Sequence, residues 1–167
     1  MIGAAAGSGK LFKLMNNKEK NEHPRSKEAI RTWLRLLSCE SVIERELRSQ
    51  FRENFKITLP QFDVLSELER SGNPMTMSEL SRELMVSNGN VTGVIDRLEK
   101  GGLVSRTRAE HDRRVQYIAL TVEGRRRFDE MAGRHEEWLN ELFSELSQTD
   151  MTELQSLLLK ARNSATP

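Results

Sequence analysis

Two helix-forming stretches near the middle of the chain are joined by a very short connection, and this pattern restricts the fold more than any other. Thr76 and Glu79 have the spacing of a capping box, which predicts a short helix over 77–85. Ser87 can cap a second helix that stops at the glycines 101–102, since helices commonly end at glycine. Two helices with so tight a turn predict a helix-turn-helix.

The second of these helices has one apolar face and one unusually bare face. At about 100° per residue, its apolar side chains fall within roughly a third of a turn. They are Val91, Val94, Ile95 and Leu98. Gly89 and Gly93 lie on the opposite face. Because a glycine inside a helix costs about 1 kcal/mol relative to alanine, we expect the exposed face to gain something from lacking side chains there.

A β-hairpin is predicted after the second helix. Residues 103–108 and 115–121 are β-prone and roughly alternate between apolar and polar, and the polar residues 109–114 between them favour a turn. A further helix over 61–70 precedes the helix-turn-helix. Helix, turn, helix and hairpin in this order predict a winged helix over 58–121. The fold class is therefore mainly α with a small β-hairpin wing.

Long amphipathic helices flank the predicted winged helix. Apolar residues recur at threes and fours over 26–55 and again over 128–146. Thr121 can cap the first C-terminal helix, and Thr149 or Asp150 the second. The predicted organisation is a basic tail (1–25), an N-terminal dimerisation helix (26–57), a winged helix-turn-helix (58–121) and C-terminal dimerisation helices (122–167). A domain of about 65 residues leaves these apolar stripes uncovered, so a second copy of the chain is the simplest partner.

The composition argues against several classes of protein. The chain has 167 residues, of which 31% are charged and 37% hydrophobic, as in soluble helical proteins. It contains no apolar run long enough to span a membrane and no secretory signal, so we expect a cytoplasmic protein. One cysteine and three separated histidines provide neither a disulfide nor a recognisable metal site. Without a nucleophile beside a base or a phosphate-binding loop, we expect neither an enzyme nor a cofactor.

The charge is unevenly distributed along the chain. The net charge is only +1, but residues 97–114 carry six basic and three acidic side chains, which suits a polyanionic partner. Short polar side chains at the start of a helix, with basic ones beyond, are the types that read a DNA major groove. In the second helix these are Ser87, Asn88, Asn90, Thr92 and Arg97, with Gly89 and Gly93 allowing close approach to the bases.

Simpler roles for these residues stay open. Ser87 can serve only as a helix cap, and Asn88 and Asn90 can be solvated residues of a first turn. Asp96 lies on the same face, where a carboxylate would repel phosphates. It can pair with Lys100, four residues along the helix, or hold an arginine in place.

Three stretches of the sequence resemble the MarR family of bacterial transcription regulators. They are LPQFDVLSELER (59–70), MSELSRELMVSNGNVTGVIDRLEKGGLVSR (77–106) and HDRRVQYIALTVEG (111–124), the last similar to the family's wing signature. The resemblance implies a homodimer that binds a pseudo-palindromic operator in double-stranded DNA. For many members it implies repression relieved by a small aromatic effector. The segments LRLL and MVSNGNVTG are similar to members that control aromatic-acid breakdown, including those that respond to hydroxycinnamoyl-CoA thioesters.

The resemblance also assigns roles in the wing. It carries Arg114 onto the family's minor-groove arginine and Asp112 onto the carboxylate that orients it. A narrow minor groove attracts such an arginine because its potential is strongly negative. Arg106, Arg108 and Arg113 are expected to contact phosphates or to remain solvated.

Family effectors lie where the dimer helices meet the winged helix. The candidates for such a crevice are Arg31, Trp33, Arg35, Phe62, His135 and Trp138. Core or interface packing is the simpler interpretation of the rings, and a solvated face that of the arginines. Two other functions stay open: a redox sensor that uses Cys39, which is otherwise a small buried residue, and a winged helix that binds protein without binding DNA.

Overall fold

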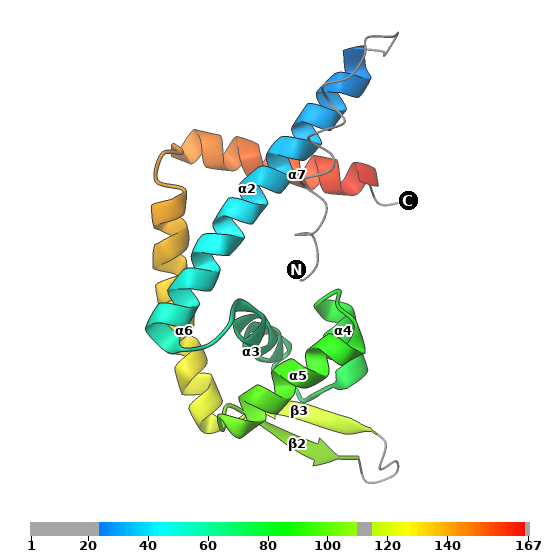
Figure 1. The fold of residues 1–167 in the computed structure, drawn as a ribbon, viewed down its shortest axis with the longest axis vertical. Coiled ribbons are helices and arrows are strands. Elements are labelled where there is room, and N and C mark those ends of the chain that lie inside the picture. The colour runs from blue at the N-terminus through cyan, green and yellow to red at the C-terminus, as the bar shows by residue number, and fades with distance from the viewer. Residues whose placement is uncertain (1–23, 110–114, 166–167) are drawn as a thin grey trace. The chain divides into compact units, whose positions relative to one another are not determined.

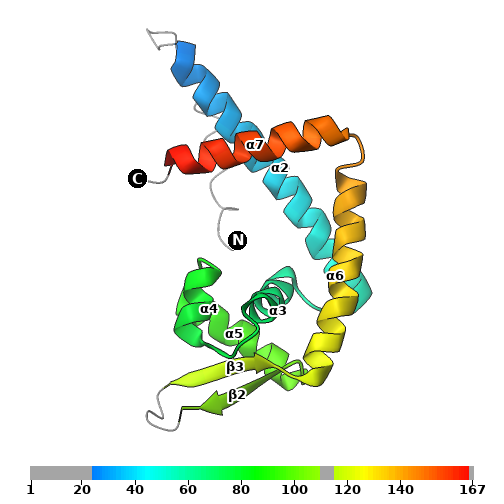
Figure 2. The same cartoon turned by 180° about the vertical axis from the view of Figure 1, so that it is seen from behind.

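The computed structural model describes residues 24–109 and 115–165, which form several helices and a small sheet (Figures 1 and 2). The helices are α2 (Pro24–Phe55), α3 (Leu59–Ser71), α4 (Met77–Glu83), α5 (Asn88–Lys100), α6 (Val122–Leu142) and α7 (Gln148–Ala165). The strands are β1 (Met75–Thr76), β2 (Val104–Arg108) and β3 (Gln116–Leu120). The predicted fold class, mainly α with a small β wing, is confirmed.

The wing contains three antiparallel strands in the order β1-β3-β2. β2 and β3 pair from Val104 opposite Leu120 to Arg108 opposite Gln116, as the alternating pattern predicted. β1 adds Met75 opposite Ile118 in β3. The sequence did not predict β1, because a strand of two residues is too short to show alternation.

The core forms where α3, α4 and α5 pack against the sheet (Figure 1). Its aromatic part joins three helices: the ring centroids of Phe51 and Phe62 are 4.4 Å apart, and those of Phe62 and Phe128 are 5.7 Å apart. This compact unit extends to the fully buried Met131, and a second unit follows it. The boundary predicted after residue 121 therefore lies inside the first unit, because the first turns of α6 supply core side chains.

Two helix starts follow the predicted capping residues. The Thr76 hydroxyl accepts a bond from the Glu79 amide at 3.2 Å, and the Glu79 carboxylate accepts one from the Thr76 amide at 2.7 Å. These bonds from Thr76 hold the pKa of Glu79 below its ordinary value. At the start of α6, the Gly124 amide donates to the Thr121 hydroxyl at 2.9 Å. Both sequence-predicted caps are confirmed.

The start of α7 differs from the prediction. Ser147, rather than Thr149 or Asp150, is the cap, because its hydroxyl accepts a bond from the Asp150 amide at 3.2 Å. The Asp150 carboxylate in turn accepts a bond from the Ser147 amide at 2.9 Å. Hydrogen bonds from the Ser147 hydroxyl and amide lower the pKa of Asp150. The segment is a capping box in which Asp150 is the third helical residue.

The turn between α4 and α5 is strained at one residue. α4 ends at Glu83, two residues earlier than predicted. Met85 then adopts a left-handed backbone conformation with φ of 54°, which is uncommon for a residue other than glycine. The Val86 amide closes the turn by donating to the Ser81 carbonyl at 3.0 Å.

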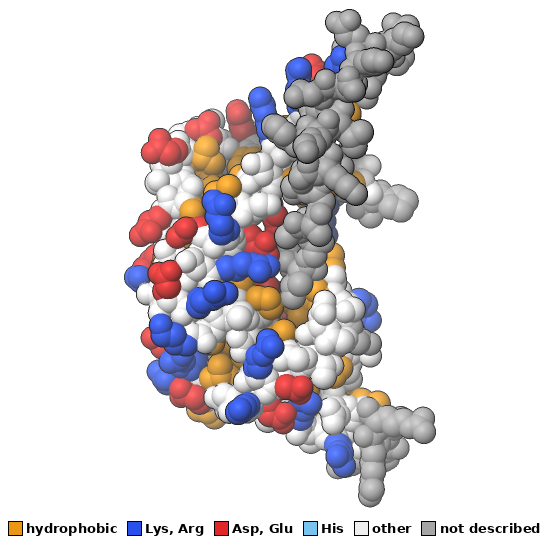
Figure 3. Space-filling model, viewed as in Figure 1, with side chains coloured by type: hydrophobic (Ala, Val, Ile, Leu, Met, Phe, Trp, Pro, Cys, Tyr) orange, Lys and Arg blue, Asp and Glu red, His pale blue; other side chains and the backbone are white. Residues whose placement is uncertain are grey.

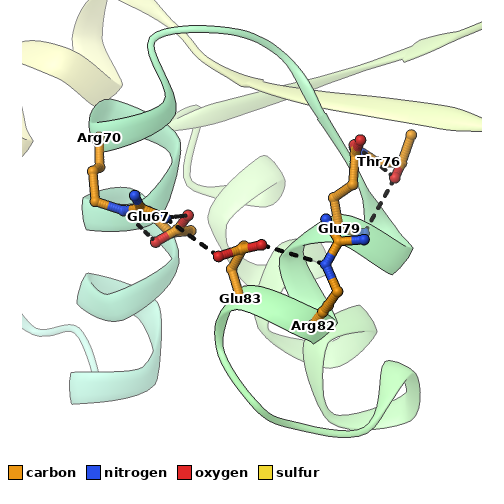
Figure 4. A network of polar contacts seen from close by, with 6 residues as sticks. All are labelled: Glu67, Arg70, Thr76, Glu79, Arg82 and Glu83. Carbon is orange, nitrogen blue, oxygen red and sulfur yellow. Dashed lines mark hydrogen bonds and ion pairs between the residues drawn. The ribbon is translucent and has the colours of Figure 1, made fainter.

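Ion pairs link α3 to α4 beside this turn (Figure 4). The Arg70 guanidinium lies 2.6 Å from Glu67 of its own helix and 3.5 Å from Glu83 of α4. Arg82 lies 3.4 Å from the same Glu83. Both arginines are largely exposed, so solvent screens these pairs, and the one pair that joins the two helices, Arg70 with Glu83, contributes little to stability.

Two helices keep apolar faces that the described part of the chain does not cover. On α2, Ile30, Trp33, Leu36 and Val42 are 41–53% exposed. α7 has no buried residue, and Leu157 is 63% exposed. Met151, Leu154, Leu157 and Leu158 follow the inward spacing that the sequence predicted, but the described part of the chain fully buries none of them.

Candidate nucleic-acid interface

Helix α5 separates a buried face from an exposed one, as its sequence predicted. The apolar residues Val91, Val94, Ile95 and Leu98 are at most 8% exposed. The opposite side is open to solvent and carries Gly89, Asn90, Thr92, Gly93, Asp96, Arg97 and Lys100. The buried stripe anchors the helix on the core and leaves a polar surface available to a partner.

The two glycines of this surface have no packing role among the described residues. A Cβ atom added to Gly89 or Gly93 would meet nothing within 4 Å. Neither glycine has the positive φ that would require this residue type. The bare backbone therefore has no explanation inside the described chain, whereas a closely approaching partner would explain it.

The first turn of α5 leaves the Ser87 side chain available. Ser87 occupies the cap position, and its carbonyl accepts a bond from the Asn90 amide at 3.0 Å, but its side chain forms no capping hydrogen bond. The capping role that was the simpler expectation for its side chain is therefore not observed. Asn90 is exposed, and the side chain of Asn88 lies outside the described residues.

The end of α5 is locked to the wing. The Gly102 amide donates to the Glu99 carbonyl and the Leu103 amide to the Leu98 carbonyl, each at 2.9 Å, with Gly102 at a φ of 72°. These bonds form a Schellman motif, so the predicted glycine stop is confirmed. The Thr121 hydroxyl donates to the Gly102 carbonyl at 2.7 Å and thereby ties the start of α6 to the same turn.

Arg106 connects the wing strand β2 to α5. Its guanidinium contacts the Asp96 carboxylate, and its Nε lies 3.1 Å from Oε2 of Glu99. The Arg106 side chain is only 20% exposed. The structure therefore places this predicted phosphate contact in an intramolecular ion pair. The sequence allowed either Lys100 or an arginine as the partner of Asp96, and in the structure Asp96 pairs with Arg106.

Basic residues do not form one continuous patch on the face shown in Figure 3, where Lys and Arg side chains are interspersed with Asp and Glu. Within α5, Arg97 and Lys100 occupy the last turn. Cations there also complement the helix dipole, so a structural role accompanies any contact with phosphate.

A groove that the sequence did not predict runs beside the exposed face of α5. It is lined by Arg48, Arg52, Thr58, Leu59, Pro60, Asn90, Val94 and Arg97. Arg48 and Arg52 lie four residues apart on α2, but their approach to α5 depends on tertiary packing. Asp63 lines an adjoining hollow with Asn90 and Val94, and burial raises the pKa of its carboxyl. A perturbed carboxylate in a cleft is a feature of functional sites.

Comparison with known proteins decides the family. The pattern that defines the MarR family matches residues 57–115. The HTH-type transcriptional regulator PecS of Dickeya dadantii is 34% identical over 119 residues, which cover 70% of this chain and 71% of PecS. The chain belongs to the MarR family. As a MarR-family protein, it is a DNA-binding transcription regulator and not an enzyme.

Other MarR-family relatives match over similar lengths. The transcriptional activatory protein BadR of Rhodopseudomonas palustris is 32% identical over 135 residues, 79% of this chain and 77% of BadR. AbsC of Streptomyces coelicolor, a MarR-family regulator, has 26% identity and a TM-score of 0.70, with 87% of this chain and 97% of AbsC covered. A cysteine-to-serine mutant of MarR from E. coli, solved with operator DNA, has 27% identity and a TM-score of 0.69, with 80% and 95% covered.

The MarR-family wing signature falls partly outside the described residues. Asp112, Arg113 and Arg114 belong to this part, so their roles remain predictions. Arg108, on the strand that leads to them, is exposed.

In the described ranges, 24–109 and 115–165, no helix is long and apolar enough to cross a membrane.

The MarR-family effector candidates lie in different environments. Arg31, Trp33 and Arg35 are exposed on α2, whereas Phe62 is buried between other core rings. In the second unit Trp138 is buried, and partial burial lowers the pKa of His135. Arg134 lies 5.8 Å from the centre of the Trp138 ring. Packing in the core therefore explains the aromatic side chain at Phe62 without an effector. Cys39 was expected to be a small buried residue, but it is exposed.

Proposed function

We propose that the protein is a homodimeric repressor in which α5 of each copy enters one half of a pseudo-palindromic operator. The exposed face of α5 is the observation that carries this proposal. This face is polar, and the Ser87 hydroxyl at its start forms no capping hydrogen bond. At Gly89 and Gly93 it lacks side chains, although no packing in the described chain requires glycine there. A helix that lies in the major groove gains from such a face, because short side chains bring its backbone close to the bases.

The homodimer is supported by the apolar faces that one chain leaves open. The exposed side chains of α2 and α7 include Trp33 at 53% and Leu157 at 63%. Several large apolar side chains exposed on one helix are typical of an interaction surface. A second copy provides the same two helices, and a two-fold dimer would supply an apolar partner for each of them.

Leu157→Glu is expected to convert the dimer into a monomer at micromolar concentration. A carboxylate in the proposed interface would be desolvated without a partner, which costs several kcal/mol in the dimer and little in the monomer. Light scattering coupled to size exclusion measures the mass. Ser156→Glu, on the opposite face of α7, is the matched control and should remain dimeric. An unchanged dimer for Leu157→Glu would mean that α7 does not form the interface.

The proposed effector is a small aromatic acid or its CoA thioester. The groove beside α5 supports this chemistry, since Arg52 and Arg97 offer guanidinium groups to a carboxylate, whereas Arg48 is paired with Glu44 at 2.7 Å. Leu59 and Pro60 provide an apolar wall for a ring. Because one side of the groove belongs to α5, a ligand bound there would favour a position of this helix different from the DNA-bound one. The exposed Arg31 and Arg35 remain candidates for the phosphates of a CoA thioester.

Release of bound operator tests this function. A duplex selected from a randomised library is bound to the protein and titrated with benzoate, hydroxycinnamate and their CoA thioesters. We expect one of these compounds to release the DNA, and Arg52→Ala to shift the midpoint by about tenfold or more. A shift for Arg31→Ala but not Arg52→Ala would place the effector elsewhere. Release by peroxide that is abolished in Cys39→Ser would instead establish a redox sensor.

The direction of regulation is measured in the same system. A reporter behind the selected operator should be expressed at a higher level when the protein is absent. Lower expression would make the protein an activator, as the name of its relative BadR describes that protein.

A further inference from the structure

Asp96 lies on the exposed face of α5, where a carboxylate does not suit a DNA-binding surface. It lies on the same side of the helix as Gly89 and Gly93, and its side chain is 56% exposed. Glu99, one turn further along, is 43% exposed. Two carboxylates near a phosphate backbone repel it, and the low dielectric of a closed interface strengthens that repulsion.

Arg106 is directed towards these carboxylates by the geometry of the wing. Alternate residues of a strand point to the same face, so Arg106 shares its face with Val104 and, across the ladder, with its partner Ile118. Val104 and Ile118 are 2% and 0% exposed, which identifies this as the core side of the sheet. The Arg106 side chain therefore extends inward to α5 rather than outward to solvent.

The resulting contacts are a hydrogen-bonded ion pair with Asp96 and a second ion pair, without hydrogen-bond geometry, with Glu99. One terminal nitrogen contacts Asp96 and Nε lies 3.1 Å from Glu99, so a single side chain of β2 holds two residues of α5. With the side chain only 20% exposed, these interactions are screened less than ordinary surface ion pairs.

We propose that Arg106 is a positioning residue that masks Asp96 and Glu99 and holds α5 against the wing strand. In this arrangement Asp96 and Glu99 can lie on the DNA-facing side without repelling phosphate. The ion pairs also keep α5 and the wing in a fixed relative position when they bind DNA. The proposal rests on the DNA-binding function argued above. In this role Arg106 acts through the two carboxylates of α5 rather than through a phosphate contact of its own.

A double-mutant cycle on operator affinity distinguishes masking from a phosphate contact. Arg106→Ala is expected to weaken binding about tenfold or more, because both carboxylates become unpaired. Asp96→Asn alone should change affinity by no more than about threefold. Adding Asp96→Asn to Arg106→Ala should restore part of the affinity, since one of the two unmasked charges is then gone. Arg106→Lys keeps the positive charge but loses the planar guanidinium group. Its operator affinity should therefore lie between those of the wild-type protein and Arg106→Ala.

The controls separate this role from stability and from the DNA-binding function itself. Arg108→Ala, two residues along the same strand, should combine additively with Asp96→Asn. Circular dichroism and stoichiometric titration with operator give the folded and active fractions of each variant, and affinities are compared per active dimer. Additive effects for Arg106 and Asp96, or wild-type affinity for Arg106→Ala, would overturn the proposal. Failure of the wild-type protein to bind any selected duplex would instead refute the proposed function.

Discussion

Gly93→Leu is expected to weaken operator binding by about a hundredfold while making the isolated protein more stable. Leucine gains about 0.8 kcal/mol of helix propensity over glycine, and a Cβ atom at this position meets nothing within 4 Å among the described residues. In the complex, however, the new side chain would occupy the space between the α5 backbone and the bases. Losing two base contacts, each worth about 1–3 kcal/mol, corresponds to roughly a hundredfold change in affinity.

The two opposite effects of Gly93→Leu are measured on the same preparation. Urea denaturation gives the free energy of unfolding, and fluorescence anisotropy with labelled operator gives the dissociation constant. Gly133→Leu is the matched control, because Gly133 is also an exposed helical glycine with open space around it. It should show the same gain in stability and unchanged affinity. Wild-type affinity for Gly93→Leu would show that the glycines of α5 are tolerated rather than used.

Gly124→Ala is expected to destabilise the fold by about 3 kcal/mol, the largest effect on stability that we expect from a single methyl group. A Cβ atom at this position would overlap the Leu103 carbonyl oxygen and lie 2.8 Å from its carbon. The clash is with backbone, which cannot rotate away as a side chain could. The contact joins the first turn of α6 to the end of α5, where Thr121 is also bonded to the Gly102 carbonyl.

The effect of Gly124→Ala is measured by urea denaturation followed by circular dichroism. Gly133→Ala, a methyl group added to the other α6 glycine, should instead raise the unfolding free energy by about 1 kcal/mol. If Gly124→Ala were as stable as the wild-type protein, the close approach of α6 to Leu103 would be incorrect.

Much of the fold was predictable because local rules decided it. The stripe from Val91 to Leu98 fixes which side of α5 is buried, and the glycines at 101–102 fix where the helix stops. The start of α7 was assigned to the wrong residue because Ser147 and Asp150 satisfy each other reciprocally, and either residue type can cap. The compact unit extends past the predicted boundary because Phe128 completes an aromatic stack whose other members lie far away in sequence.

The candidate site was predictable only where one element forms it. Helical periodicity was sufficient to place Gly89 and Gly93 on the open face of α5. The pairing of Arg106 with Asp96 required the placement of a strand against a helix. Strand alternation puts Arg106 on the face of the buried Val104, and this signal in the sequence could have shown that it points inward. The groove beside α5 brings together three helices, so no periodicity could have revealed it.

Dimethyl sulfate probing of the bound operator tests most directly whether α5 reads the major groove. The reagent methylates guanine N7, which faces that groove. We expect protection in two half-sites whose centres are about 10 base pairs apart, or a multiple of this spacing, as a two-fold dimer requires. Gly93→Leu should lose this protection at concentrations where Gly133→Leu retains it. Guanines that stay fully reactive in a saturated wild-type complex would show that α5 does not lie in the major groove.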